Sequence, residues 1–129
     1  QADIQFLGWP HDAVAKTQSL AHVLLLPVIT NGALSSIPSK LPAYMFSKRP
    51  VLATLDTDSD TARAIKAANC GWVGNAQDEN WLAVAMQHVC QMDKQALKTL
   101  GLNGYRYGMA NFSKAVNLNK LVHNITGLL

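Results

Sequence analysis

The feature that most constrains the fold of this chain is a pair of uninterrupted apolar runs. They are "HVLLLPVI" at residues 22–29 and "PVLATL" at residues 50–55, and each has the length of one strand. Runs of this kind are typical of parallel strands that are buried on both faces of a sheet, because helices cover both sides. Pro50 is tolerable because it stands at the first position of its run. We therefore expect two central strands of a parallel sheet.

Shorter strands and helices alternate with these runs. We expect further strands at "DIQFLGW" (residues 3–9) and "CGWVG" (residues 70–74). Helices are predicted over about residues 12–20, from the "DTDSD" segment to near Asn69, and after Asp78. Two more are predicted from about Asp93 to Leu100, ending before Gly101, and over about residues 113–125. This order predicts an α/β fold: a Rossmann-like parallel sheet with flanking helices, joined by right-handed crossovers.

Size and composition narrow the class of protein further. The 129 residues suit one domain, and the charged fraction of 15% is well below the roughly 25% of typical soluble domains, which suggests that a partner domain covers part of the surface. A net charge of +3 without a basic tract is compatible with anionic small molecules or an acidic membrane surface and is too weak to argue for nucleic acid. Cys70 and Cys90 are isolated, so we expect buried thiols in a reducing compartment and no metal site. No apolar run approaches the ~18 residues of a membrane span.

The junction after the first long run is "SSIPSKLPAYMF", residues 35–46, and it can begin a helix in two ways. If Ser36 is the N-cap, Pro38 lies in the first turn but Pro42 falls inside the helix, at a cost of ~3 kcal/mol. If Ser39 is the N-cap, Pro42 lies in the first turn, where a missing N–H is harmless. We prefer Ser39, after a looser turn at residues 36–38.

This junction has the composition of an anion-binding site. Ligands of open parallel sheets bind at the carboxyl ends of the strands, which is where this loop lies. A helix start carries partial positive charge, the hydroxyls of Ser35, Ser36 and Ser39 can donate hydrogen bonds, and Lys40 adds a full charge. Diphosphate is the ligand that fits best. The competing interpretation is ordinary capping beside one exposed lysine.

Several segments together resemble a known family. These are "FLGW", "LLLPVI", "IPSKLPAYMFSKRPVLAT", "ANCGWVGNAQDENWLAVAM" and "LGLNGYRYGMANFS", in this order along nearly the whole chain. They are similar to the C-terminal domain of retaining glycosyltransferases of the GT-B fold, of the family-four type that builds bacterial surface polysaccharides. The series carries the resemblance rather than any single motif. The family's domain begins with an earlier strand and a Gly-rich turn, so we expect a fragment of a longer chain that lacks them.

The resemblance implies where a sugar nucleotide binds. Pro38, Ser39 and Lys40 match the helix start that family members bring to the donor diphosphate, and Gly71 matches the glycine before a late strand. Family members often carry two glutamates eight positions apart, and the matching positions here are Ser35 and Ala43. Neither side chain can accept ribose hydroxyl bonds as a carboxylate does.

Other residues could replace or supplement these contacts. Asp56, Asp58 and Asp60 follow the second run and could supply a carboxylate, although helix capping by Asp58 or Asp60 is the preferred interpretation. Gly8, Trp9 and His11 lie at or just after the "FLGW" strand end, where weaker contacts with nucleotide or sugar are expected.

For several other residues, a structural role is the preferred interpretation. His22 is read as a residue at the surface edge of the sheet. Trp72 and Trp81 could stack on a base or sugar, but packing against a neighbouring helix is the commoner role. Tyr105, Arg106 and Tyr107 precede the last predicted helix, and the resemblance implies that they contact the N-terminal domain.

The function predicted from the resemblance is transfer of a sugar, with retention, from a UDP- or GDP-sugar to a glycan or lipid-linked acceptor. The predicted partners are the nucleotide sugar, the acceptor and an N-terminal GT-B domain, and the chain by itself is expected to be inactive. No metal, cofactor or nucleic acid is expected, and no catalytic residue is assigned. The expected location is cytoplasmic, with peripheral contact at the inner face of a membrane allowed. The alternative is a degenerate, non-catalytic GT-B domain that acts as an assembly or regulatory module in polysaccharide synthesis.

Overall fold

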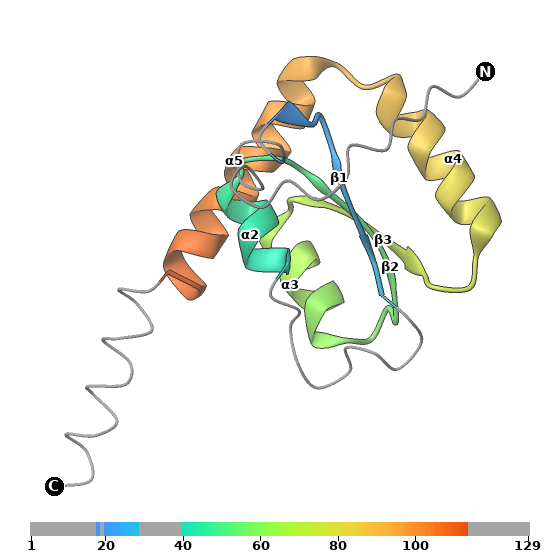
Figure 1. The fold of residues 1–129 in the computed structure, drawn as a ribbon, viewed down its shortest axis with the longest axis horizontal. Helices are drawn as coiled ribbons and strands as arrows, with labels where there is room; N and C mark the ends of the chain where they lie inside the picture. The colour runs from blue at the N-terminus through green and yellow to red at the C-terminus, as the bar shows by residue number, and fades with distance from the viewer. Residues whose placement is uncertain (1–17, 19, 29–39, 114–129) are drawn as a thin grey trace, which may run out of the picture.

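A computed structural model describes residue 18, residues 20–28 and residues 40–113. Three strands alternate with four helices in these ranges (Figure 1). The elements are β1 (Leu24–Pro27), α2 (Lys40–Phe46), β2 (Val51–Leu55), α3 (Asp60–Ala68), β3 (Gly71–Asn75), α4 (Glu79–Cys90) and α5 (Lys94–Asn111). The predicted strand at residues 3–9 and the predicted helix at 113–125 lie outside the described residues, apart from Ser113, and so does nearly all of the helix at 12–20.

The sheet confirms the predicted α/β class. Its described strands are all parallel, in the order β1-β2-β3, with Leu24 opposite Val51 and Val51 opposite Gly71. Sequential parallel strands require a crossover between each pair, and α2 and α3 supply these two connections. Pro50 precedes β2 rather than opening it, and its carbonyl accepts a hydrogen bond from the Leu24 N–H (2.9 Å).

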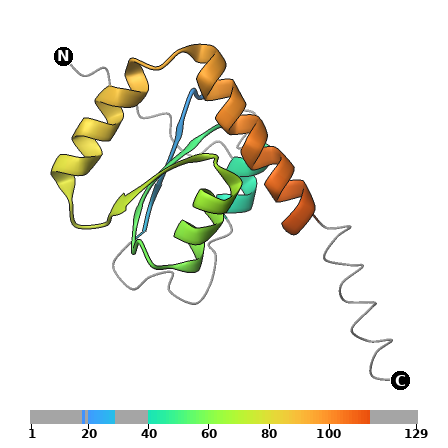
Figure 2. The same cartoon turned by 180° about the vertical axis from the view of Figure 1, so that it is seen from behind.

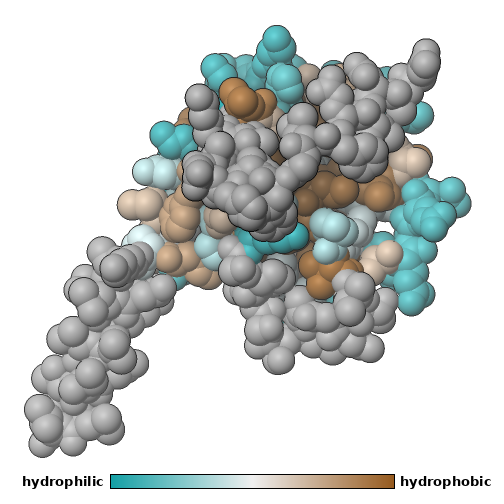
Figure 3. Space-filling model, in the orientation of Figure 1, coloured by the Kyte–Doolittle hydropathy of each residue, from teal (hydrophilic) through white to brown (hydrophobic). Residues whose placement is uncertain are grey.

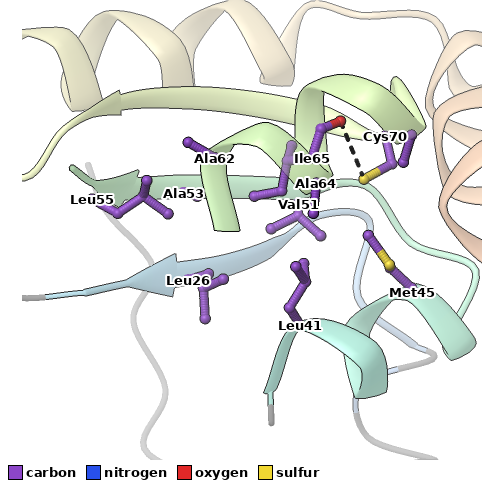
Figure 4. Packing of buried hydrophobic residues seen from close by; sticks show 11 residues of the cluster. Leu26, Leu41, Met45, Val51, Ala53, Leu55, Ala62, Ala64, Ile65 and Cys70 are labelled. Atoms are coloured by element: carbon purple, nitrogen blue, oxygen red, sulfur yellow. Dashed lines mark hydrogen bonds between the residues drawn. The ribbon is translucent and has the colours of Figure 1, made fainter. Parts of the chain in front are cut away.

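The hydrophobic core lies on one face of the sheet. Figure 4 shows Leu26 and Val51 of the strands meeting Leu41 and Met45 of α2 and Ile65 of α3. All five of these side chains are almost fully buried. Small residues of α3, Ala62, Ala64 and Ala68, let that helix lie close to the sheet, so the core is formed by α2 and α3 on this face.

The prediction that the first long run is buried on both faces is wrong. Leu24 and Leu26 are buried, whereas Leu25 is 41% exposed. Only β2 has every residue buried. Side chains alternate between the two faces of a strand, so Leu25 belongs to the face of the sheet that is opposite the core. An unbroken apolar run therefore does not show that helices cover both faces.

The cap of α3 also differs from the prediction. Ser59, not Asp58 or Asp60, is the N-cap, and its side chain accepts a hydrogen bond from the Ala62 N–H (3.2 Å). Ser59 is fully buried, a position that an ionised carboxylate would occupy only at a large desolvation cost. At the other end, Asn69 adopts the left-handed conformation, as expected for a residue that ends a helix.

Helix α5 does not end at Gly101. It continues to Asn111, and its buried positions are Leu97, Gly101, Gly104 and Gly108. A β-carbon on Gly101 would lie 2.6 Å from the Lys48 carbonyl carbon, and one on Gly104 would lie 3.0 Å from the β-carbon of Cys70. These glycines therefore permit close approach of α5 to the α2 side of the sheet, instead of terminating the helix.

The opposite face of the sheet is covered less completely. Helix α4 contacts β3 but stands away from α2 and α3 in both views (Figures 1 and 2). Asp78 caps α4 as predicted, accepting from the Trp81 N–H (2.9 Å). Within α4 only Val89 is buried, and Met86 is 50% exposed although its spacing predicted an apolar contact face. In the described ranges, no helix is both long and apolar enough to cross a bilayer.

Candidate functional site

The carboxyl ends of the parallel strands meet at one edge of the sheet. Val28 follows β1, Asp56 follows β2 and Asn75 ends β3. Because α2 connects β1 to β2 and runs back along the sheet, its first residue, Lys40, belongs to this same edge. Lys48 follows the end of α2 and belongs to the opposite, amino edge.

Contacts of α2 with the sheet fix the position of Lys40. Leu41 and Met45 are fully buried in the core. Between them, the Tyr44 hydroxyl donates a hydrogen bond to the Leu25 carbonyl (3.0 Å). Desolvation raises the pKa of Tyr44, which keeps the phenol protonated as a donor. Helix α2 is thus attached to both β1 and the core, while Lys40 stays exposed at the helix start.

Most of the predicted site lies outside the described residues. Lys40 and Ala43 are described, and both are exposed on α2. The remaining predicted contacts fall in residues 1–17 and 29–39: Gly8, Trp9, His11, Ser35, Ser36, Pro38 and Ser39. The start of α2 at Lys40 places Pro42 in the first turn, and the choice between Ser36 and Ser39 as N-cap lies outside the described residues.

Ala43 presents only a methyl group at the position where the family resemblance implies a ribose-binding glutamate. Its backbone carbonyl is already engaged, since it accepts from the Ser47 hydroxyl (2.9 Å) and the Ser47 N–H (3.1 Å). A methyl group has no lone pair with which to bind ribose hydroxyls. Any recognition of a ribose at this point of α2 must therefore come from another residue.

Acidic residues follow two of the strand ends at the carboxyl edge. Asp56, Asp58 and Asp60 follow β2, and Asp78 follows β3. Arg63 partly neutralises this group, because it forms an ion pair with Asp60 and donates to the Asp58 carbonyl (2.6 Å). An anion would be repelled from the β2 and β3 side of this edge and accepted on the α2 side.

These carboxylates do not form a metal centre. Among the described residues, no group of three or more His, Cys, Asp or Glu side chains is arranged to hold a metal ion. The two cysteines differ from the expectation that both are buried, since Cys70 is buried and Cys90 is exposed. Burial raises the pKa of the Cys70 thiol to about 11, so this thiol is a packing residue rather than a nucleophile.

Three of the candidate residues in the described ranges, Gly71, Trp72 and Trp81, have packing roles. Trp81 lies against Gly74, where any side chain would overlap its ring, and Trp72 meets His88 edge to face, with 6.5 Å between the ring centroids. A β-carbon on Gly71 would lie 2.7 Å from the Val51 carbonyl carbon, which agrees with close packing there. His22 is exposed at the start of β1, as predicted.

Sequence reasoning missed a groove on the face of the sheet away from the core. It has a volume of about 490 Å³ and is lined in part by Leu25, Leu52, Met86 and Leu97, with Lys94 and His22 also contributing. Figure 3 shows apolar surface gathered on this side of the molecule, between the places where Figure 1 draws β1 and α4. The exposure of Leu25 could not be predicted, because this residue stands inside a continuous apolar run, which is typical of a fully buried strand.

A second cavity lies at the amino edge. Its volume is about 350 Å³, and its lining residues are Ser47, Lys48, Arg49, Lys98 and Leu102. Lys48 and Arg49 are the chain's only adjacent basic pair, which was a partial signal. Lys98 comes from a helix far along the sequence, so only the packing of α5 on α2 brings it to this cavity.

Comparison of the chain with protein-family models, with curated proteins and with solved structures gave no significant match. The resemblance to GT-B glycosyltransferases therefore depends on the sequence segments quoted above.

Proposed function

We propose that this chain is the nucleotide-sugar-binding part of a retaining glycosyltransferase of the GT-B type. The observation that supports the proposal best is the placement of Lys40. It is the first residue of a helix attached to β1 by the Tyr44 hydrogen bond, at the edge where open parallel sheets bind ligands. The parallel sheet itself agrees with a Rossmann-like nucleotide domain.

In the proposed reaction, Lys40 contacts the diphosphate of a UDP- or GDP-sugar. Negative charge grows on the diphosphate as the bond to the sugar breaks, and a fixed ammonium group stabilises that charge more than it stabilises the intact donor. Because Leu41 and Met45 are held in the core, the lysine backbone does not have to be reorganised during the reaction. Acceptor binding and the other substrate contacts would be made by residues outside the described ranges or by another domain.

A titration of the labelled protein tests donor binding. UDP, GDP and inorganic pyrophosphate are added while backbone amide NMR signals are followed. We expect shifts at Lys40 and Leu41, and Lys40→Ala should weaken binding roughly tenfold, because one charge-assisted hydrogen bond contributes ~1.5–3 kcal/mol. Lys66→Ala, which removes an exposed lysine on α3, serves as the control.

The stronger nucleotide would identify the class of donor. If none of the three compounds shifts the Lys40 and Leu41 amides at millimolar concentration in the folded protein, the donor site proposed for this chain is wrong. Equal weakening by Lys40→Ala and Lys66→Ala would also contradict it, since that result would reflect net charge alone.

One observation favours a second candidate function. Ala43 is exposed, and it stands at the position where the resemblance implies a ribose-binding glutamate. A degenerate domain that serves as an assembly or regulatory module in polysaccharide synthesis would tolerate this residue. Loss of all nucleotide binding in the longest natural form of the protein, with its fold intact, would favour this function over catalysis.

A further inference from the structure

Charge is distributed unevenly between the two edges of the sheet. There is no Asp or Glu between residues 13 and 55, or between residues 94 and 129. The first range contains α2 and the turn after it, and the second contains α5, which packs on α2. The carboxylates at residues 56–60 instead follow β2 at the opposite, carboxyl edge. The turn after α2 and the helix α5 from Lys94 onward therefore carry basic residues without acidic ones.

Basic residues of two elements line the amino-edge cavity. Lys48 and Arg49 come from the turn between α2 and β2, and Lys98 comes from α5. Ser47 adds a hydroxyl and Leu102 an apolar wall to the same cavity of about 350 Å³. No acidic side chain is among its described lining residues. Two lysines from different elements, with Arg49 beside them, suit a doubly or more highly charged anion better than a single carboxylate.

Packing holds Lys48 in place before any ligand arrives. Its backbone has a φ of 60°, which is the left-handed conformation and is unfavourable for a residue with a side chain. The Lys48 carbonyl group abuts Gly101, and the Lys48 ammonium lies 4.7 Å from the centroid of the Tyr105 ring. A cation–π contact of this kind leaves the other N–H donors available and reduces the entropy lost on binding.

We propose that this cavity is a phosphate-binding site, formed by Lys48, Arg49 and Lys98. Guanidinium and ammonium groups form strong hydrogen bonds with phosphate oxygens. The phosphate group can belong to a soluble phosphorylated compound or to the headgroup of an anionic phospholipid. This site is separate from the proposed donor site, because Lys48 and Lys40 lie at opposite ends of α2.

The surface beside the cavity bears on the source of the phosphate. Leu102 and Met109 lie four and eleven positions after Lys98, on the same face of α5, and are 39% and 44% exposed. Apolar side chains interleaved with cations are typical of surfaces that bind the headgroup region of a bilayer. A soluble ligand would use the cavity alone.

The test compares two probes on the folded protein. Inorganic phosphate is followed by amide NMR shifts, and vesicles of phosphatidylglycerol mixed with phosphatidylcholine are compared with vesicles of phosphatidylcholine alone in a sedimentation assay. We expect phosphate to shift the amides of residues 47–49 and 98–102. The double variant Lys48→Gln/Lys98→Gln should weaken phosphate binding by at least roughly tenfold. Lys98→Glu tests the site while leaving the turn at Lys48 unchanged.

The control is Arg63→Gln/Lys66→Gln, which removes the same net charge from exposed positions on α3. Binding to the anionic vesicles that is lost in the cavity variants would identify a lipid headgroup as the source. Phosphate binding without vesicle binding would identify a soluble compound. The proposal is overturned if phosphate leaves the amides of residues 47–49 unshifted and the anionic vesicles do not bind the protein, or if the control pair weakens binding as much as the cavity pair.

The two sites are read at different amides, so the experiment also separates the two proposals. Loss of the donor site would remove shifts at Lys40 and Leu41 and leave those at residues 47–49. Failure of the phosphate site would do the reverse.

Discussion

Replacing Gly101 with alanine should destabilise the protein, even though alanine is the better helix former. Gly101 lies inside α5 and faces the turn that contains Lys48. An added β-carbon would overlap the Lys48 carbonyl oxygen and would lie 2.6 Å from its carbon and 3.1 Å from the Arg49 nitrogen. The obstacle is backbone in a strained, left-handed turn, so no side-chain rotation can relieve the overlap.

Two opposing free energies decide the outcome. Gly→Ala in a helix interior stabilises by ~1 kcal/mol. Overpacking typically costs ~1–3 kcal/mol, and a contact with backbone belongs at the upper end. We therefore expect Gly101→Ala to lower the free energy of unfolding by about 2 kcal/mol.

Gly108 supplies the matched control on the same helix. A β-carbon there would lie 3.2 Å from Met45 Cβ and from the Phe46 ring, and the ring of half-exposed Phe46 can move. Gly108→Ala should thus be close to neutral, because the gain in helix propensity offsets a small packing cost. The difference between the two variants measures the close approach rather than the loss of glycine.

Urea denaturation followed by circular dichroism at 222 nm, the standard helix signal, measures both variants. The midpoint of Gly101→Ala should fall without a change in the m-value. A Gly101→Ala variant as stable as the wild type, or one indistinguishable from Gly108→Ala, would refute the argument. If the turn at Lys48 shifts as expected, the same variant should also bind phosphate more weakly.

Two further predictions concern single side chains. The pKa of Cys70 is raised from an ordinary 9.0 to about 11, so the unfolded chain releases this proton first. Stability should therefore fall by about 2–3 kcal/mol as pH rises from 9 to 11, and Cys70→Ala should lack this component in urea titrations at each pH. An equal decline in both proteins would contradict this assignment. Ser59→Ala should lower the free energy of unfolding by about 1 kcal/mol, because the bond to the Ala62 N–H is lost. Asp93→Ala, at an N-cap without a side-chain hydrogen bond, should change it by only a few tenths, and equal losses in urea denaturation would disprove the capping argument.

Local signals in the sequence predicted much of the described fold. The alternation of strand-length apolar runs with helical segments predicted the parallel α/β class, and β2, β3, α3 and α4 appear close to the predicted positions. Asp78 was correctly predicted as the cap of α4. These features depend on neighbouring residues, since a cap needs only its own first turn and a strand run needs only its own apolar side chains.

Predictions that required knowledge of distant residues were wrong. Gly101 was read as a helix stop because glycine is the commonest residue after a helix end. In the structure Gly101 lies inside α5, and glycine is required there because the Lys48 carbonyl group leaves no room for a side chain. Leu25 was expected to be buried, but α4 covers that face of the sheet incompletely.

The candidate sites divide in the same way. Lys40 could be chosen from the sequence, because a serine-rich loop and a helix start after a buried strand form a local pattern. The cavity formed by Lys48, Arg49 and Lys98 could not, since about fifty residues separate the turn from the helix that completes it.

The sequence by itself determined the class of fold, the parallel arrangement and the cap of α4, because hydrophobic periodicity and turn chemistry act over a few residues. Only the tertiary structure decided where α5 ends, which face of β1 is covered and which cations share a cavity. Those outcomes depend on close packing between elements that are distant in the chain, and packing overrides local propensities of ~1 kcal/mol per residue.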